Sequence, residues 1–428
     1  MTIQSTRVGL RIAATYLALA CSANLVAAGE PIRPADVPAP GFSLRADAPD
    51  GGLCDAIQDG HMWLKLNYRF EYVEQDGLTK DAYASTLRSV LGYETGAWND
   101  LTATLELEDV SPIGDDAYDS TINGKTDRPV VADPDSAELN QFFLKYSGWA
   151  DAAVKLGRQR IKLDNDRFIG NIGWRQNEQT FDALSVDAKQ VGPVDVFYGY
   201  LHNVNRVFGD ESPVGDHAMD SHVLNVSHVF EDLGKLVFYY YLLDYRSADS
   251  LSCSTFGARF DGRRGLSEGA DLLYTLEWAN QTDAGDNPAD RDANYMHGIL
   301  GVDVEGYVFK VGMEVLEGSG DPGSAFQTPL ATAHAFNGWA DKFLTTPDTG
   351  LEDLFFSAGT SFGKTKVTAV YHQFSPDTGG GDYGSEIDAI LTRPLGDDVD
   401  LGLKFADYAE DGFATDTTKA WFWLGYSF

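Results

Sequence analysis

The sequence predicts an all-β fold, a transmembrane antiparallel up-and-down β-barrel of about 18 strands and of the outer-membrane type. Three observations predict it. Apolar and polar residues alternate with a period of two in many short segments, long and short connections alternate along the chain, and the last nine residues, AWFWLGYSF, resemble a final membrane strand. A closed barrel lets strands cross a bilayer without leaving unpaired backbone groups in lipid.

The N-terminal residues are expected to lie outside the barrel. Residues 1–28 have the features of a signal peptide, because Arg7 and Arg11 precede an apolar run at 12–20 and small residues follow at 26–28. The proline-rich residues 29–60 are expected to form a periplasmic lead-in, and the barrel is expected to occupy residues 61–428. No later apolar run approaches the roughly 20 residues of a membrane helix.

Alternation defines the strands. In the first, Leu64 and Leu66 share one face while Lys65 lies on the other, and later segments repeat this pattern. A charge facing lipid near the bilayer midplane costs about 2–4 kcal/mol, so the mixed faces are expected to line the lumen. The expected strands are 61–73, 84–95, 99–110, 138–148, 151–160, 178–188, 193–204, 220–230, 234–246, 252–261, 268–280, 292–304, 306–318, 352–363, 365–375, 384–393, 398–408 and 417–428.

The connections alternate in length. Tight turns are expected near residues 96–98, 148–149, 231–233, 305 and 363–364. Long connections are expected near residues 111–137, 161–177, 205–219, 281–291 and 319–351. Short periplasmic turns and long extracellular loops produce this rhythm, which a soluble β-sandwich has no reason to keep.

The charge balance is strongly acidic. The chain has 32 Lys and Arg against 65 Asp and Glu, a formal net charge of −33, which argues against a nucleic-acid partner. Much of the acidity lies in the expected loops, where it predicts a solvated exterior; a loop-bound divalent cation shared with lipopolysaccharide is a lesser alternative. No calcium-loop motif is present, and we expect no other cofactor.

The basic residues are more concentrated, between 158 and 175. This segment is expected to leave a strand at its outer end and cross a long loop, which either stays outside or folds inward to narrow the lumen. Arg158 and Arg160 share the parity of Leu156, which is wrong for a pore lining unless a bulge resets the register or both lie near the membrane interface. The candidate constriction and substrate-binding residues are Arg158, Arg160, Lys162, Arg167, Arg175, Lys65, Arg69, Arg88 and Lys145.

Other residues on the inward parity have two interpretations. The further basic ones are Lys155, Lys310, Lys404 and Lys419, and the aromatic ones are Trp63, Trp421 and Trp423. Arginine and lysine there suit carboxylate binding, and the indoles suit stacking on sugar rings. Inward glutamates such as Glu71, Glu106 and Glu314 would instead form salt bridges that stabilise the wall. For each residue both roles stay open.

One segment carries a family resemblance. The stretch LGRQRIKLDNDRFIGNIGWRQNEQTFDAL, with the later motifs FYGY at 197–200 and NVNR at 203–206, resembles the alginate export family of Gram-negative outer-membrane porins. The later strands match that family in layout more than in letters. The resemblance implies that residues 61–428 form an alginate export domain, an 18-stranded barrel whose arginine-rich, loop-gated lumen lets an anionic exopolysaccharide leave the cell.

The sequence thus predicts an export porin for an alginate-like anionic exopolysaccharide in the cell outer membrane. The alternative is a substrate-selective diffusion porin for small anionic or sugar-derived nutrients. The expected partners are outer-membrane lipid, lipopolysaccharide and the polysaccharide itself, with periplasmic secretion proteins as a further class. We expect no enzyme, since no G-x-S-x-G motif occurs and the eight His residues lie at no metal-binding spacing.

Overall fold

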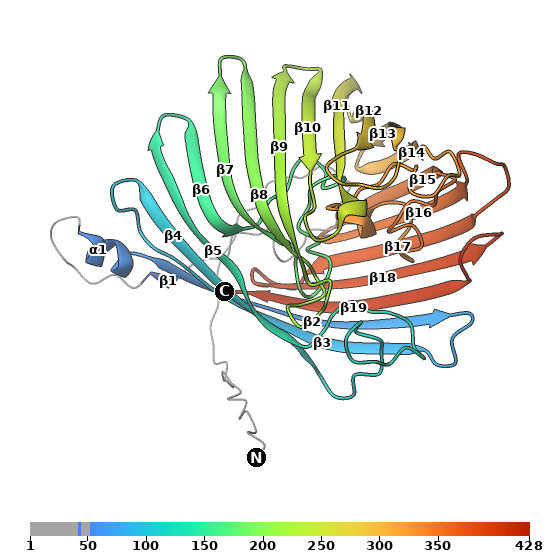
Figure 1. Ribbon diagram of the computed structural model, residues 1–428, viewed down its shortest axis with the longest axis horizontal. Helices are drawn as coiled ribbons and strands as arrows, with labels where there is room; N and C mark the ends of the chain where they lie inside the picture. Colours follow the sequence, from blue (N-terminus) through green and yellow to red (C-terminus); the bar gives the residue numbers. More distant parts are fainter. Residues whose placement is uncertain (1–41, 44–51) are drawn as a thin grey trace.

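The protein forms a closed antiparallel β-barrel. The computed structural model describes residues 42–43 and 52–428, so the expected signal peptide lies outside the described residues. Strands β2 to β19 pair each with the next, and β19 pairs with β2 to close a barrel of 18 strands (Figure 1). The predicted fold class and number of strands are therefore confirmed.

The strands agree with the expected ones to within a few residues at most ends. They are β2 (His61–Gln75), β3 (Ala82–Glu94), β4 (Leu101–Pro112), β5 (Ser136–Trp149), β6 (Ala152–Gln159), β7 (Thr180–Val191), β8 (Val194–Asn205), β9 (Asp216–Phe230), β10 (Gly234–Leu243), β11 (Cys253–Ser267), β12 (Ala270–Asp283), β13 (Asp292–Val304), β14 (Tyr307–Leu316), β15 (Leu351–Phe362), β16 (Thr365–Ser375), β17 (Gly384–Pro394), β18 (Val399–Glu410) and β19 (Thr417–Ser427).

Few other elements occur in the described part of the chain. The two-residue strand β1 (Phe42–Ser43) pairs with the start of β2, and helix α1 (Leu53–Gln58) follows it. Two 3-10 turns, η1 (Asp249–Leu251) and η2 (Ala333–Ala335), lie in loops. None of the helices in the described residues has the length and apolar character needed to cross a membrane.

The short turns use backbone conformations that join adjacent strands directly. Between β13 and β14 only Glu305 and Gly306 remain, both with positive φ, at 52° and 85°. A two-residue hairpin turn of this kind matches the twist of its flanking strands. The short turns and the end of β19 share one end of the barrel, which faces the periplasm in outer-membrane proteins.

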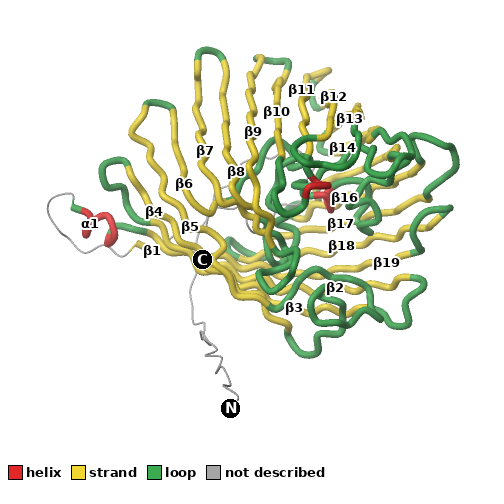
Figure 2. The backbone as a smooth tube through the Cα atoms, viewed as in Figure 1, coloured by secondary structure: helices red, strands yellow, loops and turns green. Residues whose placement is uncertain are grey.

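Alternation divides each strand into an outer and an inner face. On β19, Leu424 is exposed on the outer face, whereas the neighbouring Trp423 is buried on the inner face. A bulge in the pairing of β4 with β5 turns both Asn140 and Gln141 inward, where both donate hydrogen bonds to Glu106. The interior is therefore polar and aromatic, and loops fill much of it (Figure 2).

Candidate functional site

Two loops fold into the lumen and pair with each other. They are residues 160–179, between β6 and β7, and residues 317–350, between β14 and β15, and together we call them the plug. The amide of Gly170 donates to the carbonyl of Leu330 at 2.9 Å, and the amide of Thr332 donates to the carbonyl of Asp166 at 2.9 Å. The long loops, green in Figure 2, gather toward one end of the barrel.

Arg167 fastens the first plug loop to the far wall. Its Nε lies 2.7 Å from Glu314 on β14, and one Nη donates to Asn337 at 3.0 Å. The guanidinium also lies over the ring of Phe336, 4.8 Å from its centroid, and the residue is 2% exposed. Asn337 donates in turn to Glu314, so one wall carboxylate holds both plug loops.

Arg175 and Arg69 form a second attachment, at β2. Arg175 lies 3.1 Å from Glu71 and 3.2 Å from Asp341 of the second plug loop. Arg69 donates to the carboxylate of Asp133, in the loop between β4 and β5, and to the carbonyl of Trp174. Three loops and one wall strand therefore meet around these two guanidinium groups.

Glu178, at the end of the first plug loop, is surrounded by arginine and asparagine donors. Its carboxylate accepts hydrogen bonds from Arg160, Arg88, Asn140 and Asn171. Burial opposes its ionisation, but Arg160 and Arg88 hold the pKa of Glu178 below its usual range. Arg160 also lies 3.1 Å from Glu106. The loop is thus tied to β3 and β4 by ion pairs.

Tryptophans surround a lysine between the plug and β18. The Lys404 Nζ lies 3.8 Å from the ring centroid of Trp339, 4.2 Å from that of Trp174 and 5.5 Å from that of Trp421. It also lies 2.7 Å from Nε2 of His334, whose Nδ1 lies 2.6 Å from Asp341. An ammonium held by ring faces and one imidazole nitrogen connects the wall to both plug loops.

Arg158 does not lie in the lumen with the other arginines of this segment, which corrects the expectation that it lines the constriction. It shares the outer parity of Leu156 and forms a two-point ion pair with Asp182 on β7, at 2.8 and 3.1 Å. Strand β6 ends at Gln159, so Arg160 leaves the strand and turns inward. The register is not reset by a bulge here, and only Arg158 stays on the outer face, near the outer rim.

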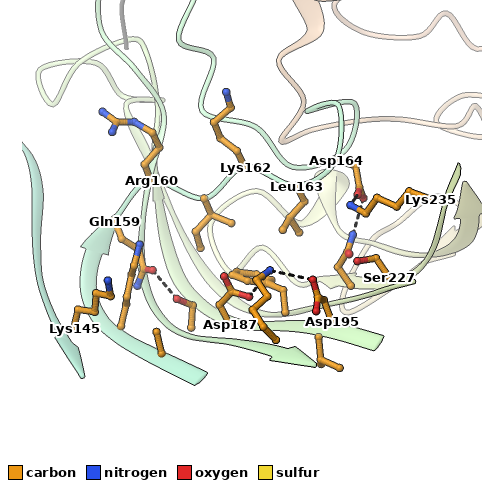
Figure 3. Close-up of a pocket in the computed structure, with 18 residues that line it drawn as sticks. Lys145, Gln159, Arg160, Lys162, Leu163, Asp164, Asp187, Asp195, Ser227 and Lys235 are labelled. Atoms are coloured by element: carbon orange, nitrogen blue, oxygen red, sulfur yellow. Dashed lines mark hydrogen bonds and ion pairs between the residues drawn. The ribbon is translucent and has the colours of Figure 1, made fainter. Parts of the chain in front are cut away.

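A basic cavity opens on the periplasmic side of the first plug loop. It has a volume of about 430 Å³ and is bounded by the inner faces of β5 to β10 and by residues 160–164 (Figure 3). Its basic side chains are Lys145, Lys155, Arg160, Lys162, Lys189 and Lys235, and its acidic ones are Asp164, Asp187 and Asp195. Basic groups outnumber acidic groups in this cavity, although the whole chain is strongly acidic.

Lys145 and Lys155 stand out among the lining residues. They are directly opposite each other in the β5–β6 ladder, and both point into the cavity. Within residues 42–43 and 52–428, neither has a carboxylate at ion-pair distance; Lys155 instead lies 5.0 Å from the ring centroid of Phe143. Like charges directly opposite on a sheet are destabilising. The ladder therefore places two ammonium groups side by side on the wall of the cavity.

The remaining candidates lie on the lumen side. Arg69 and Arg88 are buried in ion pairs with Asp133, Glu108 and Glu178. Lys65 shares the inner face of β2 with Arg69, and Lys162 lies 3.4 Å from Asp166 in its own loop. The sequence predicts residues 319–351 only as a long extracellular loop, and the part of this loop in the plug has no signal in the sequence beyond its length. No trio of His, Cys, Asp or Glu in the described residues is arranged to hold a metal ion.

Comparison with known proteins gives a family and a fold. The family model for alginate export matches residues 61–340. Solved structures with the same architecture include Acinetobacter baumannii OccAB4, with 15% identity and a TM-score of 0.67 over 86% of this chain and 98% of that one. Pseudomonas aeruginosa OccK9 (OpdG) has 15% identity and a TM-score of 0.68 over 87% and 99% of the two chains.

A third structure is Pseudomonas aeruginosa OpdK with vanillate, with 14% identity and a TM-score of 0.66 over 86% of this chain and 98% of that one. These likenesses show the fold alone. No curated relative matches the chain.

Proposed function

This chain belongs to the alginate export family and is a channel of the outer membrane, and we propose that its cargo is an anionic, alginate-like exopolysaccharide that moves outward. The observation that carries the proposal is the opposed pair Lys145 and Lys155 in the basic cavity. The pair faces the periplasmic end, where a secreted polymer would enter.

The chemistry of the cavity suits a chain of uronate residues. A polyuronate carries one carboxylate per sugar, and lysine ammonium groups attract such carboxylates as point charges without fixing their orientation. Transport requires binding that is favourable enough for entry and weak enough for release. Lys189 and Lys235 are already weakened as anion sites by Asp187 and Asp164, at 3.0 and 3.4 Å. Arg160 and Lys162 are paired with Glu178 and Asp166. Among the described residues, Lys145 and Lys155 are therefore the cavity cations that have no carboxylate at ion-pair distance.

A second candidate function is a diffusion porin for small anionic or sugar-derived nutrients. The observation in its favour is that two paired loops lie in the lumen beyond the cavity, which leaves room for a small solute more readily than for a polymer. One structural neighbour, OpdK, was solved with vanillate, a small carboxylate. The two functions differ in whether a polymer or a monomer competes for the lysine pair.

Replacing both lysines, Lys145→Ala with Lys155→Ala, is expected to weaken block of the ion current by polygalacturonate added on the periplasmic side of a planar bilayer. If each contact contributes about 0.5 kcal/mol, the half-blocking concentration rises roughly fivefold. The barrel should keep or gain thermal stability, because the substitution removes an opposed pair of like charges. Unfolding of the purified protein followed by circular dichroism checks that point.

The matched control is Arg158→Ala, which removes a positive charge on the outer face of the neighbouring part of β6. It should leave the block unchanged. If galacturonate monomer blocks wild type at the same concentration of carboxylate as the polymer, the nutrient porin is the better account. If neither ligand blocks, or if the double variant is blocked as wild type is, the proposed role of the lysine pair is wrong.

A further inference from the structure

Besides Arg175 and Gln176, which bind Glu71 and Asn67 of β2, two carboxylates and an indole ring from the loops contact the wall at β2 and β19. The Asp341 carboxylate lies 2.7 Å from the Nζ of Lys419, and Asp133 from a neighbouring loop binds the guanidinium of Arg69. Between these two ion pairs the Trp174 ring packs edge-on against Trp421 and Trp423, with centroids 5.8 and 5.6 Å apart. Two carboxylates and one flat ring thus cover two wall cations and two wall indoles.

This wall surface has the chemistry of a uronate site. We propose that Arg69, Lys404, Lys419, Trp421 and Trp423 form a binding subsite for the polymer, which the loops occupy in the closed state. In the closed state Asp133 and Asp341 occupy the positions that sugar carboxylates would take, and Trp174 occupies the position of a sugar ring. The inference rests on the proposed function and adds to it a second subsite and a way to open the channel.

The inner face of β18 and β19 places these side chains next to one another. Trp423 covers Gly402 of β18, where a Cβ atom would come within 1.8 Å of the indole, so the absence of a side chain at Gly402 lets the ring lie against the sheet. Trp421 is one inward position along β19, and Lys419 is the next. Along β19 one cation is therefore followed by two indole rings, and a second cation, Arg69 of β2, lies directly opposite Trp423.

Wall carboxylates also lie in and beside the subsite, where Glu71 is directly opposite Trp421 in the β19–β2 ladder, and they have partners of their own. Glu71 on β2 pairs with Arg175 at 3.1 Å, and Arg69 lies 3.7 Å from it. On β17, Glu386 and Asp388 accept hydrogen bonds from the backbone amides of Ala340 and Trp339. These contacts seat the plug on the wall. They leave Lys419 with Asp341 as its ion-pair partner among the described residues.

The polymer and the plug compete because both bind the same groups of the wall. A polymer that binds Lys419 and the indoles must displace Asp341 and Trp174, so its apparent affinity is reduced by the fraction of time the plug is seated. Asp341→Asn removes the negative charge that the plug places beside Lys419. Asparagine tolerates the backbone conformation of this residue, whose φ is 63°. This variant should therefore bind the polymer more tightly than wild type does.

The experiment measures binding of galacturonate oligomers to the purified, folded full-length barrel by tryptophan fluorescence, with maltose oligomers as the neutral probe. Asp341→Asn should lower the half-saturating concentration about fivefold. The control, Asp348→Asn, makes the same charge change in the same loop and should behave as wild type does, because among residues 42–43 and 52–428 the Asp348 carboxylate accepts a hydrogen bond only from the amide of Gly323. Lys419→Met loosens the plug as well but removes a subsite cation, so it should raise the half-saturating concentration.

Opposite signs for the two plug-loosening variants are the result expected. If Asp341→Asn and Lys419→Met both increase affinity, the plug merely blocks access, and the wall subsite is wrong. If wild type binds the oligomers but Asp341→Asn matches Asp348→Asn, competition by the plug carboxylate is wrong. Binding of no oligomer by any of the proteins, or equal binding of maltose oligomers, would overturn the proposed function and the subsite with it.

Discussion

Removing residues 319–349 and joining Gly318 to Gly350 through a short Gly-Ser turn is expected to convert the protein into a permanently open channel. An 18-stranded barrel without internal loops encloses an aqueous channel, so we expect the single-channel conductance to rise by roughly tenfold. The excised loop supplies Trp339, Asn337 and Asp341, which carry many of the plug's contacts with the wall. Planar-bilayer recording in symmetrical salt measures the change.

The barrel should survive this excision because the loop narrows at its base. A Cβ atom built on Gly318 would lie 2.3 Å from the backbone nitrogen of Gly350, so the two ends of the loop already touch. Leu316 and Leu351 are directly paired in the β14–β15 ladder immediately below. Joining the ends therefore makes a hairpin of ordinary length and leaves every strand pairing in place.

The control for the excision is removal of Gly379, Gly380 and Gly381 from the loop between β16 and β17, where a Cβ at any of the three would meet nothing. Its conductance should equal that of wild type. An unchanged conductance in the excised protein would mean that residues 160–179 alone close the lumen. In that case the attachment of Arg167 to Glu314 is sufficient to hold them.

The fold was predictable because its signals are local. Alternation along each strand and the short turns between strands are properties of neighbouring residues, and both follow from the bilayer and the pleat. The strands that fit least well, such as β11, run on through charged residues to Ser267, close to the periplasmic end where an outward charge costs little. Their ends therefore carry no sharp signal.

The site was predictable only in part, because the parity of a residue no longer indicates its face of the sheet once the strand has ended. Arg158 and Arg160 have the same parity, but β6 ends between them and they lie on opposite sides of the wall. The inward position of Lys145 follows from alternation, whereas its opposition to Lys155 requires the register of two strands. The plug is harder still to predict from the sequence, because Gly170 and Leu330 are 160 residues apart in the chain and no periodicity links them.

Acidification is expected to release the plug, with His334 as the responsive group. Burial lowers the pKa of His334 well below its ordinary value, and Lys404 and Arg175 lower it further, against the opposing effect of Asp341. The geometry agrees, since Nε2 faces the Lys404 ammonium and must accept a hydrogen bond. A released plug exposes His334 to water, where its pKa returns to about 6.5.

The sign of the effect follows from proton binding. Below about pH 6.5 His334 binds one more proton in the released plug than in the seated plug, so its contribution to the seated state is complete above that pH and is lost as the pH falls. The ratio of open to closed channels should rise by up to about tenfold per pH unit between pH 6.5 and 4.5. Burial raises the pKa of Asp341, but the hydrogen bond from His334 and the charge of Lys419 hold it well below its usual range, so that carboxylate does not respond in this window.

His334→Gln separates this mechanism from other acid effects. Glutamine carries no titratable group, and its amide oxygen can still accept a hydrogen bond from Lys404. Ensemble current recorded from pH 7.5 to 4.5 should rise in wild type and stay flat in the variant, whatever the variant's current at pH 7.5. Parallel pH curves for the two proteins would exclude His334 as the sensor. A flat variant would show that one imidazole, held between a wall lysine and a plug aspartate, decides how firmly the lumen is closed.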